Sequence, residues 1–523
     1  MNDPLLQRAI QLHQSGQVRQ ALDIYNQLLA WQPSNDHLLY MAGMANLQTG
    51  QTLEGMRLLQ HSLGIKQDNA PAHNNYGRAL QSLGELEKAL EAFDTALRVK
   101  PDYAEPLFHR GVVLADLNRA QEALESYDRA LKLMPGFAEA HAGRGLALRE
   151  LRRPAEALAA YDRSLALKPG QVDVHNSRGV VLQEMTRLDE ALASFERAIA
   201  MKPDYAKAHL NKAYILLLKG DLAKGWELLE WRFTQFKSPF PAPHWTGEDS
   251  LEGKTILVHA DEGIGDAIMF SRYAKSLSDL GAHVVLEVQK PIAKVLQGLE
   301  GAADVIARGA PRPAFDFHVP MLSLPYALRK TVPSVPQSTP YLRADAAKVE
   351  RWGGRIGDTR KLKVGLAWAG GTHIGKAGWR IHNEKRNISL DLLSRTLGGV
   401  DAEFYSLQKG DEAEAELRAR LGELWPRGNF HNFMDENEDF SDSAAIIANL
   451  DVVVSVDTSV VHVAAALGKP TWTLLGFAHD WRWLQDRDDS YWYESVKLYR
   501  QAADLIWEPV LQRIATDLAA FKR

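Results

Sequence analysis

The sequence predicts an α-helical solenoid followed by an α/β region of two Rossmann-like lobes. Two observations predict this fold: residues 1–236 repeat with a period of 34, and residues from 253 onward alternate strand-like and helix-like segments. The chain has 523 residues, which is more than one ordinary domain holds. Hydrophobic residues make up 46% and charged residues 24%, as in soluble globular proteins.

The 34-residue period is carried by three kinds of residue. A small residue on the second helix is followed four positions later by a large one on the same face: Ala21, Gly55, Ala89, Ala123, Ala157, Ala191 and Gly225, followed by Tyr25, Leu59, Phe93, Tyr127, Tyr161, Phe195 and Leu229. A turn residue separates the two helices: Gly16, Gly50, Gly84 and Gly220, replaced elsewhere by Asn118, Arg152 and Thr186. Proline ends the unit at Pro33, Pro101, Pro135, Pro169 and Pro203. This pattern is the tetratricopeptide repeat (TPR) signature, in about six to seven copies over residues 1–236.

The rest of the chain divides into a connector and two lobes. Residues 237–252 are a proline-rich connector, 253–345 the first lobe and 346–523 the second. Strands are expected at 255–260, 282–288, 363–370, 402–408, 452–456 and 471–476, and within DVIAR and FDFHVPM; helices are expected at 267–277, 389–397, 441–449, 459–467 and 508–521. Ligands of open α/β lobes bind outside the carboxyl ends of the strands, so the loops there are the candidate site.

The first candidate loop is DEGIGD, residues 261–266. Its three carboxylates, Asp261, Glu262 and Asp266, would repel a phosphate. A carboxylate at a helix N-terminus is held ionised, which suits a general base. Asp266 is therefore either a catalytic base or a helix cap.

The second candidate is the segment VSVDTSVVHVAAALGKP, residues 454–470, which runs from a buried strand into a helix. Asp457, Thr458 and Ser459 open that helix, where free backbone N–H groups and two hydroxyls suit a phosphate. His462 lies one turn further on the face of Thr458. The alternative for Asp457 is simple helix capping.

The third candidate is a long basic loop over residues 371–387, which carries Lys376, Arg380, Lys385 and Arg386. Such a loop either closes over a nucleotide diphosphate or is a solvated flexible loop.

Gln408 and Lys409 follow another strand and are expected to line the same cleft. In GFAHDWRWL, residues 476–484, the tryptophans stack on a ligand or pack in the core. The D-x-D triplet at 486–488 lies in a charged loop and is interpreted as chance.

Together these segments resemble the heptosyltransferase-like branch of the GT-B glycosyltransferases. The resemblance covers roughly residues 253–500 and rests on Gly265-Asp266 and on the spaced motif Asp457, Thr458, His462, Ala464, Leu467, Gly468 and Pro470. It implies metal-independent transfer, with inversion, from a nucleotide sugar. Asp266 would be the catalytic base of the first, acceptor-side lobe. Thr458 and Ser459, with Arg386 and Lys385, would hold the departing phosphate on the second, nucleotide-sugar-side lobe.

The TPR array resembles that of protein-modifying TPR glycosyltransferases of the O-GlcNAc transferase type, including bacterial enzymes that act on flagellin. An asparagine ladder lines the concave wall of that family; Asn75 and Asn211 match it here, whereas His109, Gly143 and Ser177 do not. Asn75, His109 and Asn211 are the expected acceptor-binding residues of a groove with mixed side chains.

The resulting hypothesis is a glycosyltransferase that modifies a protein, a flagellin in one reading, on a Ser/Thr hydroxyl. Two alternatives stay open: a non-catalytic TPR scaffold with a degenerate GT-B domain, and a glycolipid or polysaccharide transferase. No cofactor or metal is expected. The net charge of -5 argues against nucleic-acid and membrane partners. The lack of cysteine and of an apolar N-terminal segment favours a cytoplasmic location.

Overall fold

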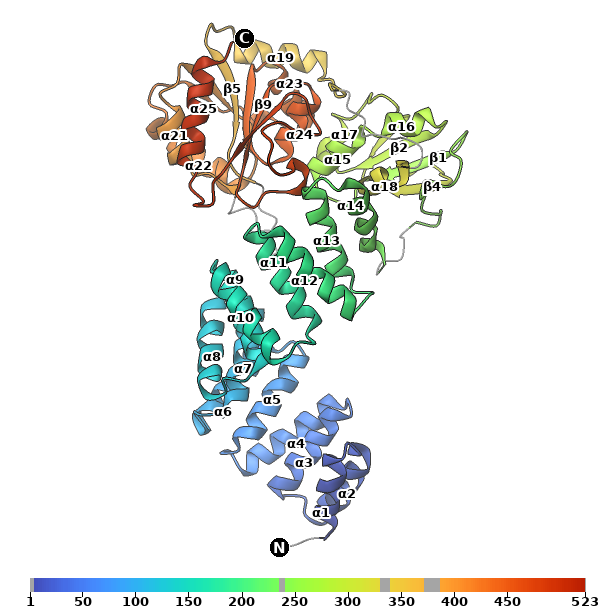
Figure 1. Cartoon of the computed structure of the whole chain (residues 1–523), viewed down its shortest axis with the longest axis vertical. Coiled ribbons are helices and arrows are strands. Elements are labelled where there is room, and N and C mark those ends of the chain that lie inside the picture. The colour runs from blue at the N-terminus through green and yellow to red at the C-terminus, as the bar shows by residue number, and fades with distance from the viewer. Residues whose placement is uncertain (1–3, 235–239, 330–338, 371–385, 523) are drawn as a thin grey trace. The chain divides into compact units, whose positions relative to one another are not determined.

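The computed structural model describes residues 4–234, 240–329, 339–370 and 386–522. It divides the chain into two compact units, Met1–Pro203 and Asp204–Arg523, coloured blue to teal and green to red in Figure 1. The 34-residue period groups the last helical pair with the solenoid, but by its contacts this pair belongs to the second unit.

The first unit is the predicted solenoid of antiparallel helical pairs. Its helices are α1 (Pro4–Gln14), α2 (Val18–Trp31), α3 (Asp36–Gln48), α4 (Thr52–Ile65), α5 (Ala70–Ser82), α6 (Leu86–Val99), α7 (Ala104–Asp116), α8 (Ala120–Leu133), α9 (Ala138–Glu150), α10 (Pro154–Leu167), α11 (Val172–Glu184) and α12 (Leu188–Met201). The seventh pair, in the second unit, is α13 (Ala206–Leu218) and α14 (Leu222–Leu229), followed by the 3-10 helix η1 (Glu230–Phe233).

The turn residues and the paired small and large residues of the repeats take the conformations and buried positions that the sequence predicts. The backbone at the expected turn residues is left-handed, including at Asn118, Arg152 and Thr186, where φ is 59°, 58° and 57°. The small residue and the large one of the second helix are buried together, as Ala191 and Phe195 show at 0% exposure. A methyl group at Gly179 would lie 2.5 Å from the ring of Phe195. The two helices of a pair therefore approach as closely as this glycine allows.

The first α/β lobe is a four-stranded parallel sheet with the order β3-β2-β1-β4. Its elements are β1 (Thr255–His259), α15 (Ile264–Ser271), α16 (Ala274–Asp279), β2 (His283–Val288), α17 (Lys290–Ala293), β3 (Asp304–Ala307), β4 (Phe317–Pro320), η2 (Met321–Ser323) and α18 (Leu324–Leu328). Strand order reverses beside β1, so a ligand site is expected beyond the ends of β1 and β4.

The second lobe is a six-stranded parallel sheet with the order β10-β9-β8-β5-β6-β7. Its elements are α19 (Ala346–Ile356), β5 (Leu362–Ala367), α21 (Leu390–Leu397), β6 (Ala402–Ser406), α22 (Asp411–Leu424), β7 (Phe430–His431), η3 (Met434–Glu436), α23 (Phe440–Ala448), β8 (Val452–Val456), α24 (Ser459–Ala466), β9 (Thr471–Leu475), η4 (Trp481–Trp483), β10 (Val496–Arg500) and α25 (Glu508–Ala520). Two Rossmann-like lobes of this kind form the predicted GT-B arrangement.

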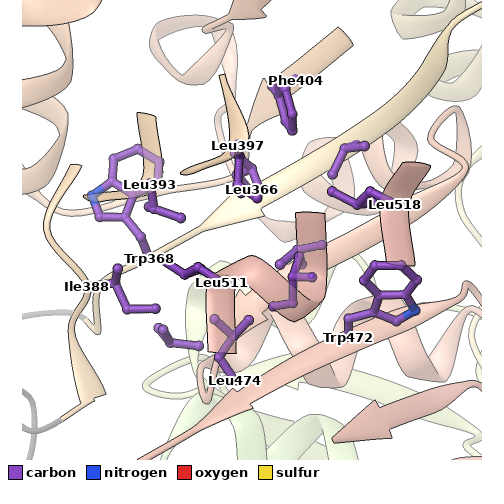
Figure 2. Close-up of a cluster of buried hydrophobic side chains, with 14 of the residues drawn as sticks. Leu366, Trp368, Ile388, Leu393, Leu397, Phe404, Trp472, Leu474, Leu511 and Leu518 are labelled. Carbon is purple, nitrogen blue, oxygen red and sulfur yellow. The ribbon is translucent and has the colours of Figure 1, made fainter. Parts of the chain in front are cut away.

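One face of the larger sheet packs on helices α21, α22 and α25 (Figure 2). Leu366, Phe404 and Leu474 point to this side from three strands, and Leu393 and Leu511 meet them from α21 and α25. All five are at most 3% exposed. Because strand residues alternate between the two faces, this packing fixes the register that brings the polar strand ends to one edge.

Two neighbouring sets of contacts join the lobes. The backbone N–H groups of Tyr341 and Leu342 donate to the Ala466 carbonyl at 3.0 and 3.1 Å. Buried Arg272 at the end of α15 donates to the Trp492 carbonyl at 2.8 Å, and its guanidinium stacks on the Tyr493 ring. The lobes therefore meet through backbone bonds and a buried cation.

The expected helix at 267–277 differs from the structure. It begins three residues earlier, at Ile264, and breaks after Ser271, so that α15 and α16 are separate helices. The break falls where Arg272 turns its guanidinium toward the Met269 and Trp492 carbonyls. Strands β7 and β10 and helices α19 and α22 were not expected. Strand β7 has only two residues, and β10 is a five-residue edge strand that carries a charged, exposed Lys497.

Among the described residues, no helix is long and apolar enough to cross a membrane. The same part of the chain contains no group of three or more histidine and carboxylate side chains that could hold a metal ion.

Candidate active site

Asp266 lies in the first turn of α15, directly beyond the end of β1. One carboxylate oxygen accepts a hydrogen bond from the Gly263 backbone N–H at 3.2 Å, and the other pairs with the Arg482 guanidinium. Its side chain is 17% exposed. Asp266 is therefore a helix cap and at the same time faces the second lobe, so the two alternatives from the sequence are not exclusive.

Gly265 lets α15 approach α24 of the second lobe. A methyl group at this position would lie 2.7 Å from the His462 ring carbon Cδ2. His462 cannot move aside, because its Nδ1 lies 2.9 Å from the Tyr493 hydroxyl and Trp483 stacks on its ring. Burial lowers the pKa of His462 to about 4, which keeps the imidazole neutral. The Gly-Asp pair thus combines close contact between the lobes with a carboxylate at their junction.

A substitution tests this close contact. We expect Gly265→Ala to lower the free energy of unfolding by about 1–3 kcal/mol, because the added methyl group overpacks a buried site. Urea unfolding followed by circular dichroism measures it. Gly422→Ala in α22 is the matched control, since nothing lies within 4 Å of its added methyl group. Equal stability of Gly265→Ala and the control would show that the lobes do not depend on this approach.

The turn between β8 and α24 provides a helix N-terminus at the neighbouring strand end. Thr458 is the N-cap residue in extended backbone, and no side chain within the described ranges caps the helix. The Thr458 hydroxyl lies 3.1 Å from that of Ser455, and the Arg386 guanidinium donates to the Asp457 carbonyl at 2.5 Å. Ser459 begins the helix. A helix start beside an arginine is a suitable anion site.

The electrostatics of this junction are strongly coupled. Burial and the nearby Asp457 carboxylate raise the pKa of Asp480, while the Arg482 backbone N–H and the Arg386 guanidinium oppose this rise. Burial lowers the pKa of Arg482 to about 10, so that it stays protonated at neutral pH. Burial also lowers the pKa of Arg386, and Asp457 and Asp480 oppose that shift. Asp457, Asp480 and Arg386 of the second lobe therefore act electrostatically on one another. Arg482 pairs with both Asp480 and Asp266 and so links this group to the first lobe.

Gln408 and Lys409 follow β6 and line a pocket of about 240 Å³ together with Trp368, Asn387 and Ser389. The Gln408 amide accepts from the backbone N–H groups of Trp368 and Ala369 at 3.0 and 2.9 Å and donates to two carbonyls. The Lys409 ammonium donates to the Met434 carbonyl at 2.8 Å. Both side chains brace the loops around the pocket through these bonds.

Lys385, Lys376 and Arg380 lie outside the described residues, so Arg386 is the one basic residue of the predicted loop that the structure describes.

The acceptor-binding candidates lie on the first helices of the repeats. Asn75 on α5 is 7% exposed and donates to the Tyr40 hydroxyl at 3.2 Å.

His109 and Asn211 complete the acceptor set. His109 on α7 stacks on Phe93, and burial, together with Arg78, lowers its pKa to about 4. Asn211 on α13 is half-buried, in the second unit.

The sequence did not indicate Arg482, which contacts both Asp266 and Asp480. Its segment stood out for Asp480 and two tryptophans, and the single arginine between the tryptophans carried no spacing signal. The role of Asp261 also differs from its neighbours in DEGIGD: it pairs with Arg232 of η1 at 3.5 Å and accepts from the Leu322 N–H at 3.4 Å. Asp261 therefore anchors the seventh helical pair rather than facing Arg482.

Comparisons with known proteins agree with this architecture. The repeats match the tetratricopeptide repeat model over residues 75–136, 122–172 and 177–229. Residues 437–488 match the model of glycosyltransferase family 9 (heptosyltransferase), and this segment contains the β8–α24 turn and Arg482. The chain carries tetratricopeptide repeats and a glycosyltransferase family 9 segment. Asp266 lies outside the matched segment.

A similar curated protein is Protein FlbA of Caulobacter vibrioides, 28% identical over 344 residues. The match covers 59% of this chain, and the chain spans about half, 54%, of that relative's length. Among solved structures, YrrB, described as a TPR protein with an unusual peptide-binding site, is 24% identical with a TM-score of 0.30, covering 34% of this chain and 90% of that one. A tetratricopeptide repeat protein from Parabacteroides merdae is 18% identical with a TM-score of 0.37, covering 45% and 93%.

Proposed function

We propose that the chain transfers a sugar from a nucleotide-activated donor to a hydroxyl group of a protein acceptor, without a metal and with inversion. The observation that carries this proposal is the meeting of Asp266, from the first lobe, with Arg482 of the second lobe. The uncapped start of α24 and Arg386 belong to the same electrostatic environment. A base for the acceptor and an anion site for the leaving phosphate are the two functions such a transfer needs.

In the proposed reaction the acceptor hydroxyl loses its proton to the Asp266 carboxylate while its oxygen attacks the anomeric carbon of the donor. The bond from that carbon to the phosphate oxygen breaks, and the nucleotide leaves with the bonding electrons on its phosphate. Backbone N–H groups at the start of α24, the Thr458 and Ser459 hydroxyls and the Arg386 guanidinium would stabilise the charge that develops on the phosphate.

Two measurements test the proposal. A thermal-shift screen with UDP-, GDP-, ADP- and CMP-linked sugars should raise the melting temperature with at least one donor, because a ligand that binds only the folded state stabilises it. Co-expression with a flagellin, the acceptor class implied by the resemblance, should then add the mass of one or more sugars to the acceptor. If no donor shifts the melting temperature and the acceptor mass stays unchanged, the transferase proposal fails.

The proposed division of labour assigns acceptor recognition to the repeats. We expect replacement of Asn75, His109 and Asn211 by alanine to leave donor affinity unchanged and to lower transfer to the protein acceptor about fivefold at sub-saturating concentration. Interfaces depend on a few anchor side chains. The repeats of the first unit stack on their neighbours, so changes to polar residues there are not expected to alter the donor site.

The matched control replaces three exposed residues of second helices, Glu91, Arg98 and Glu125, by alanine. Initial rates are compared for the full-length acceptor and for a short acceptor peptide. If the triple variant modifies the full-length acceptor as fast as the control, these three positions do not contribute to acceptor recognition.

A further inference from the structure

Arg482 joins the two lobes at the proposed catalytic carboxylate. Its guanidinium pairs with Asp266 through one nitrogen, and the other donates to Asp480 at 2.5 Å. The Arg482 side chain is 13% exposed and that of Asp266 17%. A guanidinium has a rigid planar fork, so two carboxylates bound to it are fixed in direction as well as in distance.

The segment that carries Arg482 is itself held by aromatic packing. The Arg482 guanidinium lies over the Trp481 ring, 4.4 Å from its centroid. Trp226 of the seventh helical pair packs edge-on against Trp481, at 5.1 Å between centroids, and Trp483 stacks on His462. The Arg482 backbone N–H also donates to Asp480 at 3.0 Å. Arg482 thus reaches Asp266 from a buried support, unlike an exposed side chain that samples many rotamers.

Charged and titratable groups from several elements face this ion pair. Tyr214 of α13, Glu262 of the loop before α15 and Tyr493 after η4 act electrostatically on Arg482. Asp480, just before η4, pairs with Arg482, and Asp457 after β8 and Arg386 before α21 act in turn on Asp480. Three of these groups, Glu262, Asp457 and Asp480, are carboxylates. Without Arg482, Asp266 would share the junction with like charges, which disfavour its ionised form.

We propose that Arg482 is the positioning residue of Asp266: it orients the carboxylate toward the acceptor and keeps it ionised. This inference rests on the proposed function, in which Asp266 is the base. The pair has two separable effects. Orientation requires the planar fork, whereas the charge effect requires only a cation at the same position.

The test compares Arg482→Met, Arg482→Lys and wild type by the pH dependence of the initial rate. The rate is the release of the nucleotide from whichever sugar donor of the panel wild type consumes: the nucleoside diphosphate from a UDP-, GDP- or ADP-sugar, or CMP from a CMP-sugar. We expect Arg482→Met to lower kcat about tenfold and to move the acid side of the profile up by about one pH unit. The sign follows because a carboxylate without its cation takes up a proton at higher pH, so the base is lost earlier on acidification. Arg482→Lys should keep the acid side in place while kcat stays reduced.

Arg487→Met is the matched control, since Arg487 lies on the same segment and pairs with exposed Asp489 at 2.7 Å. Its kcat and profile should equal those of wild type. Melting temperatures separate misfolding from catalysis, and Arg482→Lys retains the charge if the methionine variant is unstable.

The outcomes separate the two proposals. If Asp266→Asn keeps wild-type turnover, the base assignment itself is wrong. If Asp266→Asn is inactive while Arg482→Met keeps the wild-type rate and acid side, Asp266 is the base but Arg482 does not position it. Faster turnover of Arg482→Met would mean that the ion pair restrains Asp266, which also overturns the inference.

Discussion

Asp266→Asn is expected to lower the rate of sugar transfer by about 10²- to 10⁴-fold, the range typical for loss of a general base. The amide has the same shape, and its oxygen can still accept the Gly263 N–H that bonds to Asp266 now at 3.2 Å. It cannot accept a proton from an acceptor hydroxyl. Initial rates measured with a donor from the nucleotide-sugar panel give the effect.

Donor affinity separates this loss from a folding defect. The Asp266→Asn variant should bind the nucleotide sugar within about threefold of wild type by calorimetry. Asp279→Asn is the matched control, because it makes the same substitution at an exposed carboxylate at the end of α16 in the same lobe, which pairs with Lys275, and it should keep its turnover within about threefold. Turnover of Asp266→Asn within tenfold of wild type would reduce Asp266 to a helix cap.

Arg386→Ala and Thr458→Val should each weaken donor binding by roughly ten- to a hundredfold, because each variant loses one hydrogen bond to the donor phosphate. This loss corresponds to about 1.5–3 kcal/mol of binding free energy. Arg386 already lies against the turn, donating to the Asp457 carbonyl at 2.5 Å. The Thr458 hydroxyl lies at the start of α24, where it does not cap the helix and is bonded to the Ser455 hydroxyl at 3.1 Å. Isothermal titration calorimetry with the donor found by thermal shift measures both variants.

Thr473→Val provides the control for the threonine change, because it makes the same substitution at a fully buried threonine on the adjacent strand β9. Its donor affinity should match wild type. If Arg386→Ala and Thr458→Val both bind the donor as tightly as the control, the phosphate lies elsewhere, and the pocket beside Gln408 and Lys409 becomes the first alternative.

The 34-residue period determined the solenoid without any tertiary information. Each unit repeats the same local requirements: a left-handed turn residue, a small residue against a large one, and a proline that ends the second helix. These are contacts within a unit and with its neighbour, so the sequence pattern contains them completely. The central strands of both lobes could be predicted for a similar reason, since buried parallel strands are continuous apolar runs in the sequence.

The edge strands β7 and β10 of the second sheet and the break after α15 were not predicted, although the edge strands β3 and β4 of the first sheet were. Strand β10 carries the exposed Lys497 within a short alternating segment, and its pairing with β9 is a contact between segments far apart in sequence. The end of α15 depends on Arg272 reaching the carbonyl of Trp492, 220 residues away in the chain. The helix and strand propensities of the local sequence do not indicate such distant partners.

At the candidate site, the sequence by itself determined which residue types stand at the strand ends: Gly265 and Asp266 in one lobe, Asp457, Thr458 and His462 in the other. Only the tertiary structure decided that Gly265 packs on His462 and that Asp266 pairs with Arg482. It also decided that the Gln408 side-chain amide bonds to backbone groups. The reason is physical. A motif specifies local backbone geometry, but the partner of a charged side chain depends on which distant segments fold against it and on the water they exclude.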